Sequence, residues 1–227
     1  ALDRWLGSAL GLASGRCVAD VGAGTGKFSK RLAATGAETI AVEPVDAMRA
    51  QAALLQGVQA LAGTAQSMPL PDASFDAVVC AQAFHWFAGR QALDEFARVL
   101  KPGGRLGLVW NVRDESVDWV AAITALITPY EGDAPRFYKG DWRKPFPHPA
   151  FTPLEEAVFA HAHAGPPSQV IVDRFMSVSF IAVLPDADKA HVHAELERLI
   201  ATHPALRGRE TVCLPYHTLA FHCTRVA

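Results

Sequence analysis

The stretch Asp20-Val-Gly-Ala-Gly-Thr-Gly-Lys27 decides the fold of this chain. It ends an apolar run, Cys17–Val21, that is typical of a buried strand, and it leads into residues 27–35, whose pattern predicts a helix ended by Gly36. Glycines in such a turn let the backbone approach a ligand closely. The stretch therefore predicts a ligand site at the carboxyl end of a buried strand.

Strand patterns and helix patterns alternate on both sides of this turn. Strands are predicted over 39–43, 58–62, 75–81 and 105–111, and helices over 2–13, 46–56 and 92–100. Strands that are apolar throughout are typical of a parallel sheet covered by helices on both faces. The pattern predicts an α/β fold with a doubly wound, Rossmann-like sheet.

The composition narrows the class of protein. The 227 residues carry a net charge of -2, half of them are hydrophobic and 19% are charged. We expect one domain with a large core, and the near-neutral charge argues against binding nucleic acid by charge alone. No apolar run reaches the roughly 18 residues of a membrane span. Four cysteines without a CxxC pair, and no signal-peptide pattern, predict a cytoplasmic protein with reduced thiols.

Three classes of ligand compete for the glycine turn. A phosphate-binding P-loop needs a glycine and a Ser or Thr at places that Val21 and Phe28 occupy here. A dinucleotide fingerprint reads G-x-G-x-x-G, and Lys27 stands at the place of its last glycine. The observed G-x-G-x-G spacing, with an acid two residues ahead of it, resembles the first motif of class I S-adenosylmethionine-dependent methyltransferases.

The resemblance extends over residues 16–111, and the turn Lys101–Gly104 is similar to the methyltransferase type 11 group. It implies a seven-stranded, mostly parallel sheet with an antiparallel last strand, whose final two strands are residues 154–163 and 210–225; the latter pattern also fits a hairpin-like pair. Residues 16–111 would form the cofactor-binding half of a single domain over 1–227, and residues 112–227 the substrate-side half. Since relatives usually carry a further N-terminal segment over the cofactor, we expect such a lid to be missing before Ala1.

The resemblance implies S-adenosylmethionine as cofactor and S-adenosylhomocysteine as product. Asp20 would accept from the ammonium group, directly or through water. Glu43, at the end of the second strand, would accept from the ribose hydroxyls or be a solvated acid. Met48 would lie against adenine or ribose, or in the core, and Thr64 stands where relatives often carry an adenine-binding acid. The predicted cofactor contacts are Asp20, Gly22, Ala23, Gly24, Gly26, Glu43, Pro44, Met48, Thr64, Ala65, Gln66, Ala81 and Gln82.

The run Ala81-Gln-Ala-Phe-His-Trp-Phe87 follows the fourth predicted strand, on the side of the reacting methyl group. It looks like small-molecule members of the type 11 group, including those similar to trans-aconitate methyltransferase. No D/N-P-P-Y motif and no Pro-Cys nucleophile is present here, which counts against DNA-base methylation. His85 is predicted as a general base or substrate orienter, with packing under the cofactor as the alternative. Trp86 would form a wall beside the sulfonium or pack in the core.

The sequence pattern of the substrate-side half allows fewer definite predictions. Trp110, Asn111 and Arg113 end the fifth strand, and Arg113 could pair with a substrate carboxylate or form a surface ion pair with Asp114 or Glu115. The proline- and glycine-rich excursion 130–150 mixes bases with aromatics, which suits a lid over a small substrate or RNA stacking. We favour the lid because the rest of the chain offers no basic field. Helices are predicted over 116–128 and 186–202.

These patterns predict a cytoplasmic S-adenosylmethionine-dependent methyltransferase that acts on a small molecule, at a carboxylate or a hydroxyl. An RNA-directed methyltransferase and a non-catalytic adenosyl-binding interaction protein are the alternatives, and the glycine spacing disfavours a nicotinamide dehydrogenase. The nine histidines form no pattern that completes a metal site, so no metal is expected. A membrane partner is not expected either, and the sequence does not determine the oligomeric state.

Overall fold

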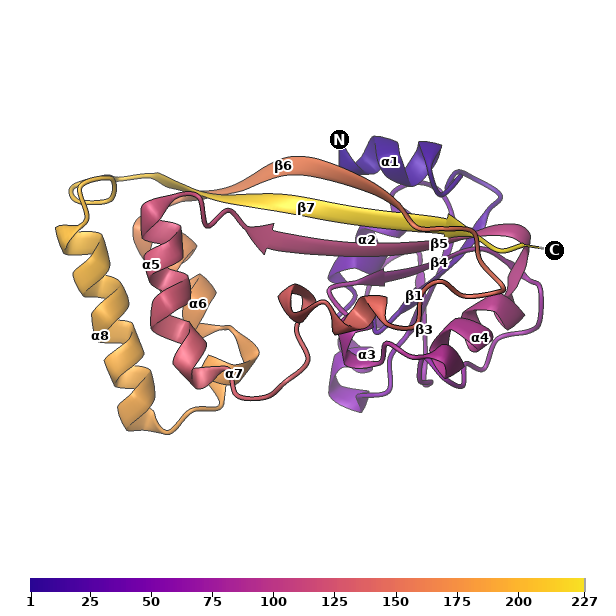
Figure 1. Cartoon of the computed structure of the whole chain (residues 1–227), viewed down its shortest axis with the longest axis horizontal. Coiled ribbons are helices and arrows are strands. Elements are labelled where there is room, and N and C mark those ends of the chain that lie inside the picture. The colour runs from indigo at the N-terminus through magenta and orange to yellow at the C-terminus, as the bar shows by residue number, and fades with distance from the viewer. Residues whose placement is uncertain (227) are drawn as a thin grey trace. The chain divides into compact units, whose positions relative to one another are not determined.

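Among residues 1–226, which the structure describes, seven strands form one mixed sheet in the order β3-β2-β1-β4-β5-β7-β6 (Figure 1). The structure is a computed structural model. The strands are β1 (Cys17–Val21), β2 (Glu38–Val42), β3 (Val58–Leu61), β4 (Phe75–Ala81), β5 (Leu100–Arg113), β6 (Glu155–Gly165) and β7 (Val212–Thr224). This order, with β7 antiparallel, confirms the predicted Rossmann-like, doubly wound fold.

Strand β1 is the point at which the strand order reverses. It pairs in parallel with β2, where Val21 stands opposite Val42, and with β4, where Asp20 stands opposite Val79. The chain runs from β1 through β2 to β3 on one side and returns to β4 and β5 on the other. Right-handed crossovers then put the connecting helices on opposite faces. A ligand crevice is expected outside the carboxyl end of β1.

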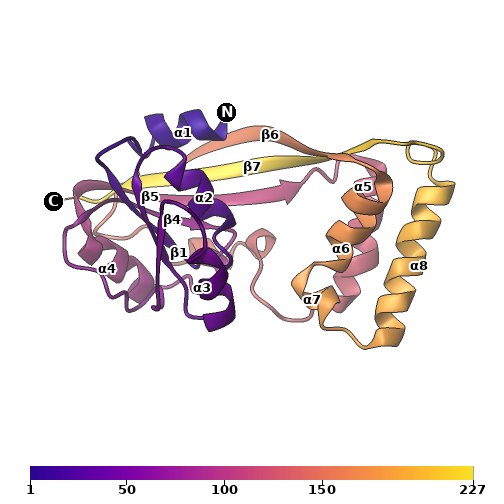
Figure 2. The same cartoon turned by 180° about the vertical axis from the view of Figure 1, so that it is seen from behind.

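Most predicted elements form, with shifted ends. Figure 2 shows α1 (Leu2–Ser8), α2 (Lys27–Ala33), α3 (Asp46–Ala52) and α4 (Arg90–Val99) beside strands β1 to β4. Helix α1 is shorter than the predicted 2–13, and the chain turns at Gly11, whose φ is +69°. Strand β5 begins at Leu100 instead of residue 105. The predicted turn is an irregularity in the β4–β5 register, in which Gly103 has a φ of +76°. Residues 212–224 form a single strand and not a hairpin.

The chain divides into two compact units. The first comprises residues 1–110 and 135–159 and the residues from Leu219 on, and the second comprises residues 111–134 and 160–218. The prediction of a single domain over 1–227 stays a prediction. One apolar core of the first unit is formed by side chains from α1, β1, α2, β4, β5 and the segment after α1, among them Leu6, Leu10, Val18, Leu32, Val79 and Val109.

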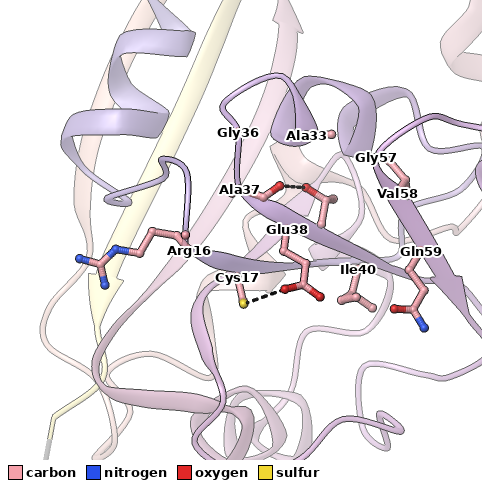
Figure 3. A pocket seen from close by; sticks show the side chains of 12 residues that line it. Arg16, Cys17, Ala33, Gly36, Ala37, Glu38, Ile40, Gly57, Val58 and Gln59 are labelled. Carbon is pink, nitrogen blue, oxygen red and sulfur yellow. Dashed lines mark hydrogen bonds between the residues drawn. The ribbon is translucent and has the colours of Figure 1, made fainter.

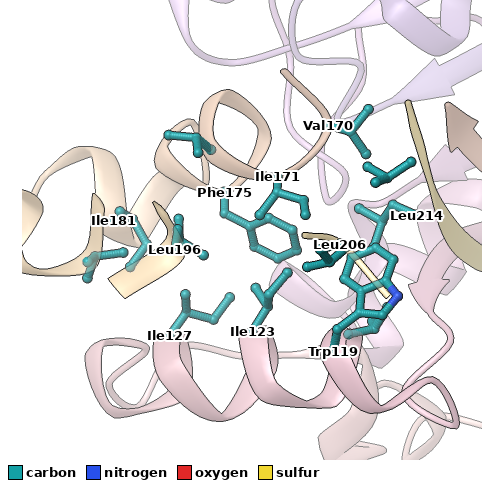
Figure 4. Close-up of a cluster of buried hydrophobic side chains, with 14 of the residues drawn as sticks. Trp119, Ile123, Ile127, Val170, Ile171, Phe175, Ile181, Leu196, Leu206 and Leu214 are labelled. Carbon is teal, nitrogen blue, oxygen red and sulfur yellow. The ribbon is translucent and has the colours of Figure 1, made fainter. Parts of the chain in front are cut away.

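The second unit has its own core (Figure 4). Its helices are α5 (Asp118–Ile127), α6 (Arg174–Met176), α7 (Ser179–Ala182) and α8 (Asp186–Thr202), and the buried side chains include Trp119, Ile123, Phe175, Ile181 and Leu196. Residues 164–185, for which the sequence predicted no element, contain a π-helical turn, Ser168–Asp173. None of the helices within residues 1–226 has the length and hydropathy that a membrane-spanning segment needs.

Arg98, on α4, holds the segment that joins β3 to β4. Its guanidinium donates to the carbonyl oxygens of Met68 at 3.2 Å and Leu70 at 2.8 Å. It also pairs with Glu95 at 2.7 Å and with Asp72 at 2.5 Å. Glu95 accepts from the backbone N–H of Met68 at 2.7 Å, and the hydrogen bond from Arg98 lowers the pKa of its carboxyl. One guanidinium thus fixes both the backbone and the acids of this segment.

We expect Arg98→Ala to lower the free energy of unfolding by about 2–4 kcal/mol, because it removes the cation beside a largely buried carboxylate and two carbonyl bonds. Arg90→Ala, at an exposed position of the same helix, is the matched control and should change it by less than about 0.5 kcal/mol. Urea unfolding measures both variants. Equal effects of the two substitutions would contradict the role given to Arg98.

Candidate active site

The glycine turn lies at the carboxyl end of β1. Gly22, Gly24 and Gly26 have φ of +70°, +58° and +79°, which favours glycine at all three positions. A Cβ on Gly22 would lie 2.8 Å from Cβ of Ala83, and one on Gly26 would lie 2.5 Å from Cδ1 of Leu55. At Gly24, a Cβ would meet no heavy atom of the described residues within 4 Å. The turn is therefore packed at its two ends and accessible to a ligand at its middle glycine.

Asp20 lies at the end of β1 and is only 1% exposed. Its Oδ2 accepts from the hydroxyl of Ser29 at 2.6 Å, whereas its buried Oδ1 accepts no hydrogen bond from residues 1–226. Burial raises the pKa of Asp20 to about 7; the Ser29 hydrogen bond opposes the rise and the Glu43 carboxylate adds to it. A buried acceptor without a donor is unfavourable, so this site suits a ligand that brings a cationic N–H group.

Glu43 follows β2 and joins it to the glycine turn. Its Oε2 accepts from the N–H of Gly24 at 2.8 Å, and its Oε1 accepts from the N–H of Val45 at 2.9 Å. The residue is buried, so the alternative of a solvated acid is wrong. The N–H groups of Gly22 and Ala23 donate to the carbonyl oxygen of Val42, at 2.9 and 3.3 Å. A carboxylate with two backbone donors keeps lone pairs for two further donors, such as vicinal hydroxyls.

Pro44 and Met48 stand beside Glu43 in the sequence and are both exposed. Met48 is 44% exposed, which contradicts its alternative as a core residue. Its apolar side chain, on α3, is accessible to a flat ligand.

The predicted adenine segment is a short closed turn. Thr64 and Ser67 exchange backbone hydrogen bonds at 3.1 Å in both directions. Ala65 is buried, while Thr64 and Gln66 are exposed. The backbone is close-packed at Gly63, where a Cβ would lie 2.8 Å from Cδ of Pro69. The turn therefore presents the two polar side chains and buries the apolar one.

On the acceptor side, the chain leaves β4 at Ala81. Gln82 has a φ of +58° and its N–H donates to the carbonyl of Val109 at 2.8 Å, which holds the chain against β5. In the following turn, Phe84–Trp86, the ring of His85 accepts at Nδ1 from the indole N–H of Trp110 at 3.1 Å. Burial lowers the pKa of His85 to about 4, and the positive charge of Arg136 acts in the same direction. His85 is therefore neutral at physiological pH.

Trp86 and Trp110 differ sharply in exposure. Trp86 is 52% exposed, so its alternative as a core residue is wrong, and the guanidinium of Arg136 lies 5.6 Å from its ring centroid. Trp110 is 1% exposed and packs on Trp142 with 4.6 Å between ring centroids. Its burial favours a role in holding His85 over direct contact with a substrate.

Trp142, in the excursion 130–150, packs inside the first unit. Its ring lies 4.9 Å from Phe221 and 4.6 Å from Trp110, and it is 1% exposed. Arg143 lies over the same two rings, 4.5 Å from Trp142 and 4.8 Å from Phe221. Trp142 is therefore internal packing and is not available for stacking with bases, whereas Arg143 and, in the same excursion, Tyr138 are exposed.

Asn111 and Arg113 belong to the second unit. The hydroxyl of Thr218 donates to Oδ1 of Asn111 at 2.7 Å, and Nε of Arg113 donates to Oγ1 of Thr124 at 3.1 Å. Within residues 1–226, no direct ion pair joins Arg113 to Asp114 or Glu115. The Glu115 carboxylate accepts from the same Thr124 hydroxyl at 3.0 Å and still attracts the Arg113 charge. Burial lowers the pKa of the Arg113 guanidinium.

A separate hollow of about 690 Å³ lies at the other ends of the strands (Figure 3). Its lining includes Cys17, Glu38 and Val58, which begin β1, β2 and β3. Cys17 Sγ donates to Oε2 of Glu38 at 3.4 Å. This hollow is at the amino ends of the strands and takes no part in the candidate site.

Three residues of the site were not predicted. Ser29 is fully buried on the first turn of α2, and a polar residue on the inner face of that helix was the available signal. Arg49 donates to the carbonyl oxygens of Glu43 at 3.0 Å and Pro44 at 3.3 Å, for which the sequence offers no signal. Arg136 was recognised only as one base of the excursion.

Comparison with known proteins agrees with this geometry. Residues 19–108 match the methyltransferase domain family. An uncharacterized methyltransferase-like protein of Schizosaccharomyces pombe is 39% identical over 209 residues, which cover 90% of this chain and 80% of that protein. A solved structure of a candidate type II methyltransferase from Anaeromyxobacter dehalogenans has a TM-score of 0.74 and 26% identity, and the match covers 99% of this chain and 94% of that chain.

A geranyl diphosphate methyltransferase solved in complex with SAM shares the fold, with a TM-score of 0.53 and 13% identity over 99% of this chain and 84% of that chain. The strand order, the glycine turn and the two buried acids together define a class I methyltransferase. The chain belongs to the methyltransferase domain family of type 11.

Proposed function

We propose that this protein is an S-adenosylmethionine-dependent methyltransferase that acts on a small molecule. The observation that carries the cofactor assignment is the pair of buried acids beside the glycine turn, with one oxygen of Asp20 left without a donor. The cofactor supplies an electrophilic methyl group on a sulfonium. The chain's own groups fit it, because an orphaned buried carboxylate oxygen matches an ammonium group and the space beside Gly24 accepts an amino-acid backbone.

The other predicted contact residues are assigned to successive parts of the cofactor. Glu43 would accept from the ribose hydroxyls with the lone pairs that Gly24 and Val45 leave, and Met48 would lie against the adenine ring. Thr64 and Gln66 are exposed at the turn that follows β3, where they can meet the polar edge of the base. Ala81 and Gln82 lead from β4 to His85 and would face the methyl group. From the base to the methyl group, these assignments follow the carboxyl ends of β3, β2, β1 and β4, which is the order of these strands in the sheet.

Glu43→Ala should weaken the binding of S-adenosylhomocysteine by about 1–3 kcal/mol, because it removes the ribose acceptor together with the anchor of the Gly24 N–H. Glu38→Ala, at the opposite end of the same strand β2, is the matched control and should leave the affinity unchanged. Titration calorimetry measures both. Unchanged affinity in Glu43→Ala would remove Glu43 from the cofactor site.

A small-molecule acceptor is supported by charge and by packing. The net charge is -2, and Trp142, the tryptophan of the excursion, is buried against Phe221 and is not available for stacking with bases. Four free cysteines, of which Cys80 and Cys223 have thiol pKa values raised by burial, are in keeping with a cytoplasmic location.

The experiment that tests the acceptor class is a transfer screen with methyl-labelled S-adenosylmethionine. The acceptors are a metabolite extract and total RNA, each incubated with the full chain. We expect label in the metabolite fraction only. Label in RNA alone would establish the RNA-directed alternative, and cofactor binding without transfer to either would favour a non-catalytic protein.

A further inference from the structure

His85 and Trp110 form a hydrogen bond whose direction is fixed by chemistry. An indole nitrogen can only donate, so Nδ1 of His85 must accept the bond from Trp110 at 3.1 Å. A neutral imidazole carries one proton, and that proton must then be on Nε2. His85 is held neutral by its burial, and Arg136 is the charged group that faces it. Its Nε2 is consequently a hydrogen-bond donor.

The indole is itself rigidly held. Trp110 is 1% exposed and lies among Phe137, Trp142 and Phe221, at ring-centroid distances of 4.8, 4.6 and 5.9 Å. These contacts leave the ring no room to turn its N–H away from His85. The turn that carries His85 is fixed as well, because Gln82 and Trp86 form backbone hydrogen bonds to Val109 and Ala83.

We propose that Trp110 is a positioning residue that fixes His85 as a neutral Nε2–H donor, and that the methyl acceptor held by this donor is an oxygen acid that is already ionised. This inference deepens the proposed function and rests on it for the acceptor. A general base needs a free lone pair, and the only lone pair of His85 is used by Trp110. The guanidinium of Arg136, beside Trp86, adds positive charge near the same donor.

An ionised acid needs no base. One lone pair of a carboxylate oxygen forms the bond to the methyl carbon, the carbon–sulfur bond breaks, and its electron pair stays on sulfur. The negative charge of the acid and the positive charge of the sulfonium cancel, so the products are a neutral ester and a thioether and no proton moves. His85 would orient the second oxygen of the acid from Nε2–H. A protonated amine, in contrast, would first have to lose a proton, and His85 has no free lone pair to take it.

The tautomer is tested without any substrate. Protein labelled with nitrogen-15 in histidine is examined by long-range proton–nitrogen NMR between pH 5 and 8, and His85→Gln assigns the signals. We expect His85 to carry its proton on Nε2 throughout. Trp110→Phe should convert His85 to a mixture of tautomers that titrates at higher pH. Trp142→Phe shortens the neighbouring ring but leaves the indole N–H of Trp110 in place, so it should preserve the Nε2–H form of His85. A proton on Nδ1 in the unaltered protein, or equal spectra in both variants, overturns the positioning role.

The acceptor is tested by release of S-adenosylhomocysteine from a set of carboxylic acids and the amines with the same carbon skeletons. We expect transfer to acids, with a loss of about tenfold in His85→Ala and of only a few fold in His85→Gln, whose amide can still donate. Transfer to the amines and not to the acids overturns the acceptor class. Failure of the proposed function is distinguishable, because the chain would then bind no adenosyl ligand while the NMR signature of His85 stayed in place.

Discussion

Gly24→Ala should fold and yet bind S-adenosylhomocysteine about a hundredfold more weakly than the unaltered protein. The added Cβ meets no atom of the described chain within 4 Å, so it would project into the space proposed for the cofactor. Inserting a methyl group into a close contact costs about 1–3 kcal/mol, and a hundredfold loss corresponds to the upper part of that range. Titration calorimetry at pH 8 measures the affinity.

Gly103→Ala is the matched control for this substitution. Gly103 has a φ of +76°, close to the +58° of Gly24, and a Cβ on it likewise meets nothing within 4 Å among the described residues. Both variants should lose about 1 kcal/mol of folding free energy, because alanine is disfavoured at positive φ. Only Gly24→Ala should lose the ligand. Equal affinities of the two variants would mean that S-adenosylhomocysteine does not occupy the space beside Gly24.

The second large effect expected is the dependence of ligand affinity on pH. Since burial raises the pKa of Asp20 to about 7, its carboxylate is only about 1% ionised at pH 5. We expect the affinity for S-adenosylhomocysteine to fall by about a hundredfold between pH 8 and pH 5, because the ligand's ammonium group needs the ionised form. Asp20→Asn should bind weakly at every pH and show no such change. Titrations at pH 5, 6, 7 and 8 measure this, and a flat profile in the unaltered protein would contradict the ammonium contact.

The same carboxyl affects stability in the opposite sense. The pKa of Asp20 in the folded protein is about 7, above the usual 3.8. Its protonated form therefore contributes its full stabilising free energy below about pH 4, and this contribution is lost as pH rises through 7. Asp20→Asn should therefore raise the free energy of unfolding of the ligand-free protein at pH 8, by about 2–4 kcal/mol at about 1.4 kcal/mol per pH unit. At pH 4 the two proteins should be similar. Urea unfolding at both values checks the sign.

The first half of the fold could be predicted from the sequence because its strands are short, mostly apolar runs between turn residues. The parallel register also makes Asp20 and Glu43 neighbours, since Val21 stands opposite Val42. Residues 164–185 gave no prediction because their apolar positions do not follow a helical period. Val170 and Ile171 are fully buried there in a π-helical turn, which a period of 3.6 residues does not describe.

Within the site, the residue types were predictable and their hydrogen bonds were not. Ala81 and Val109 pair across β4 and β5, so His85 and Trp110 were expected near the same edge of the sheet. The direction of the indole depends on Trp142 and Phe221, which lie far along the chain. In the same way, Glu43 was predicted to bind a ribose, but its bond to the N–H of Gly24 depends on the closed shape of the turn. The sequence pattern does not predict the orientation of a side chain when residues far along the chain determine it by packing.

The most direct test of the central claim is titration calorimetry of the full chain at pH 8 with S-adenosylhomocysteine, S-adenosylmethionine and NAD, on a sample shown to be folded by circular dichroism. The G-x-G-x-G turn and the two buried acids predict that both adenosyl ligands bind, with one site per chain, and that NAD does not. A folded sample that binds neither adenosyl ligand, or that binds NAD more tightly than both, would contradict the account.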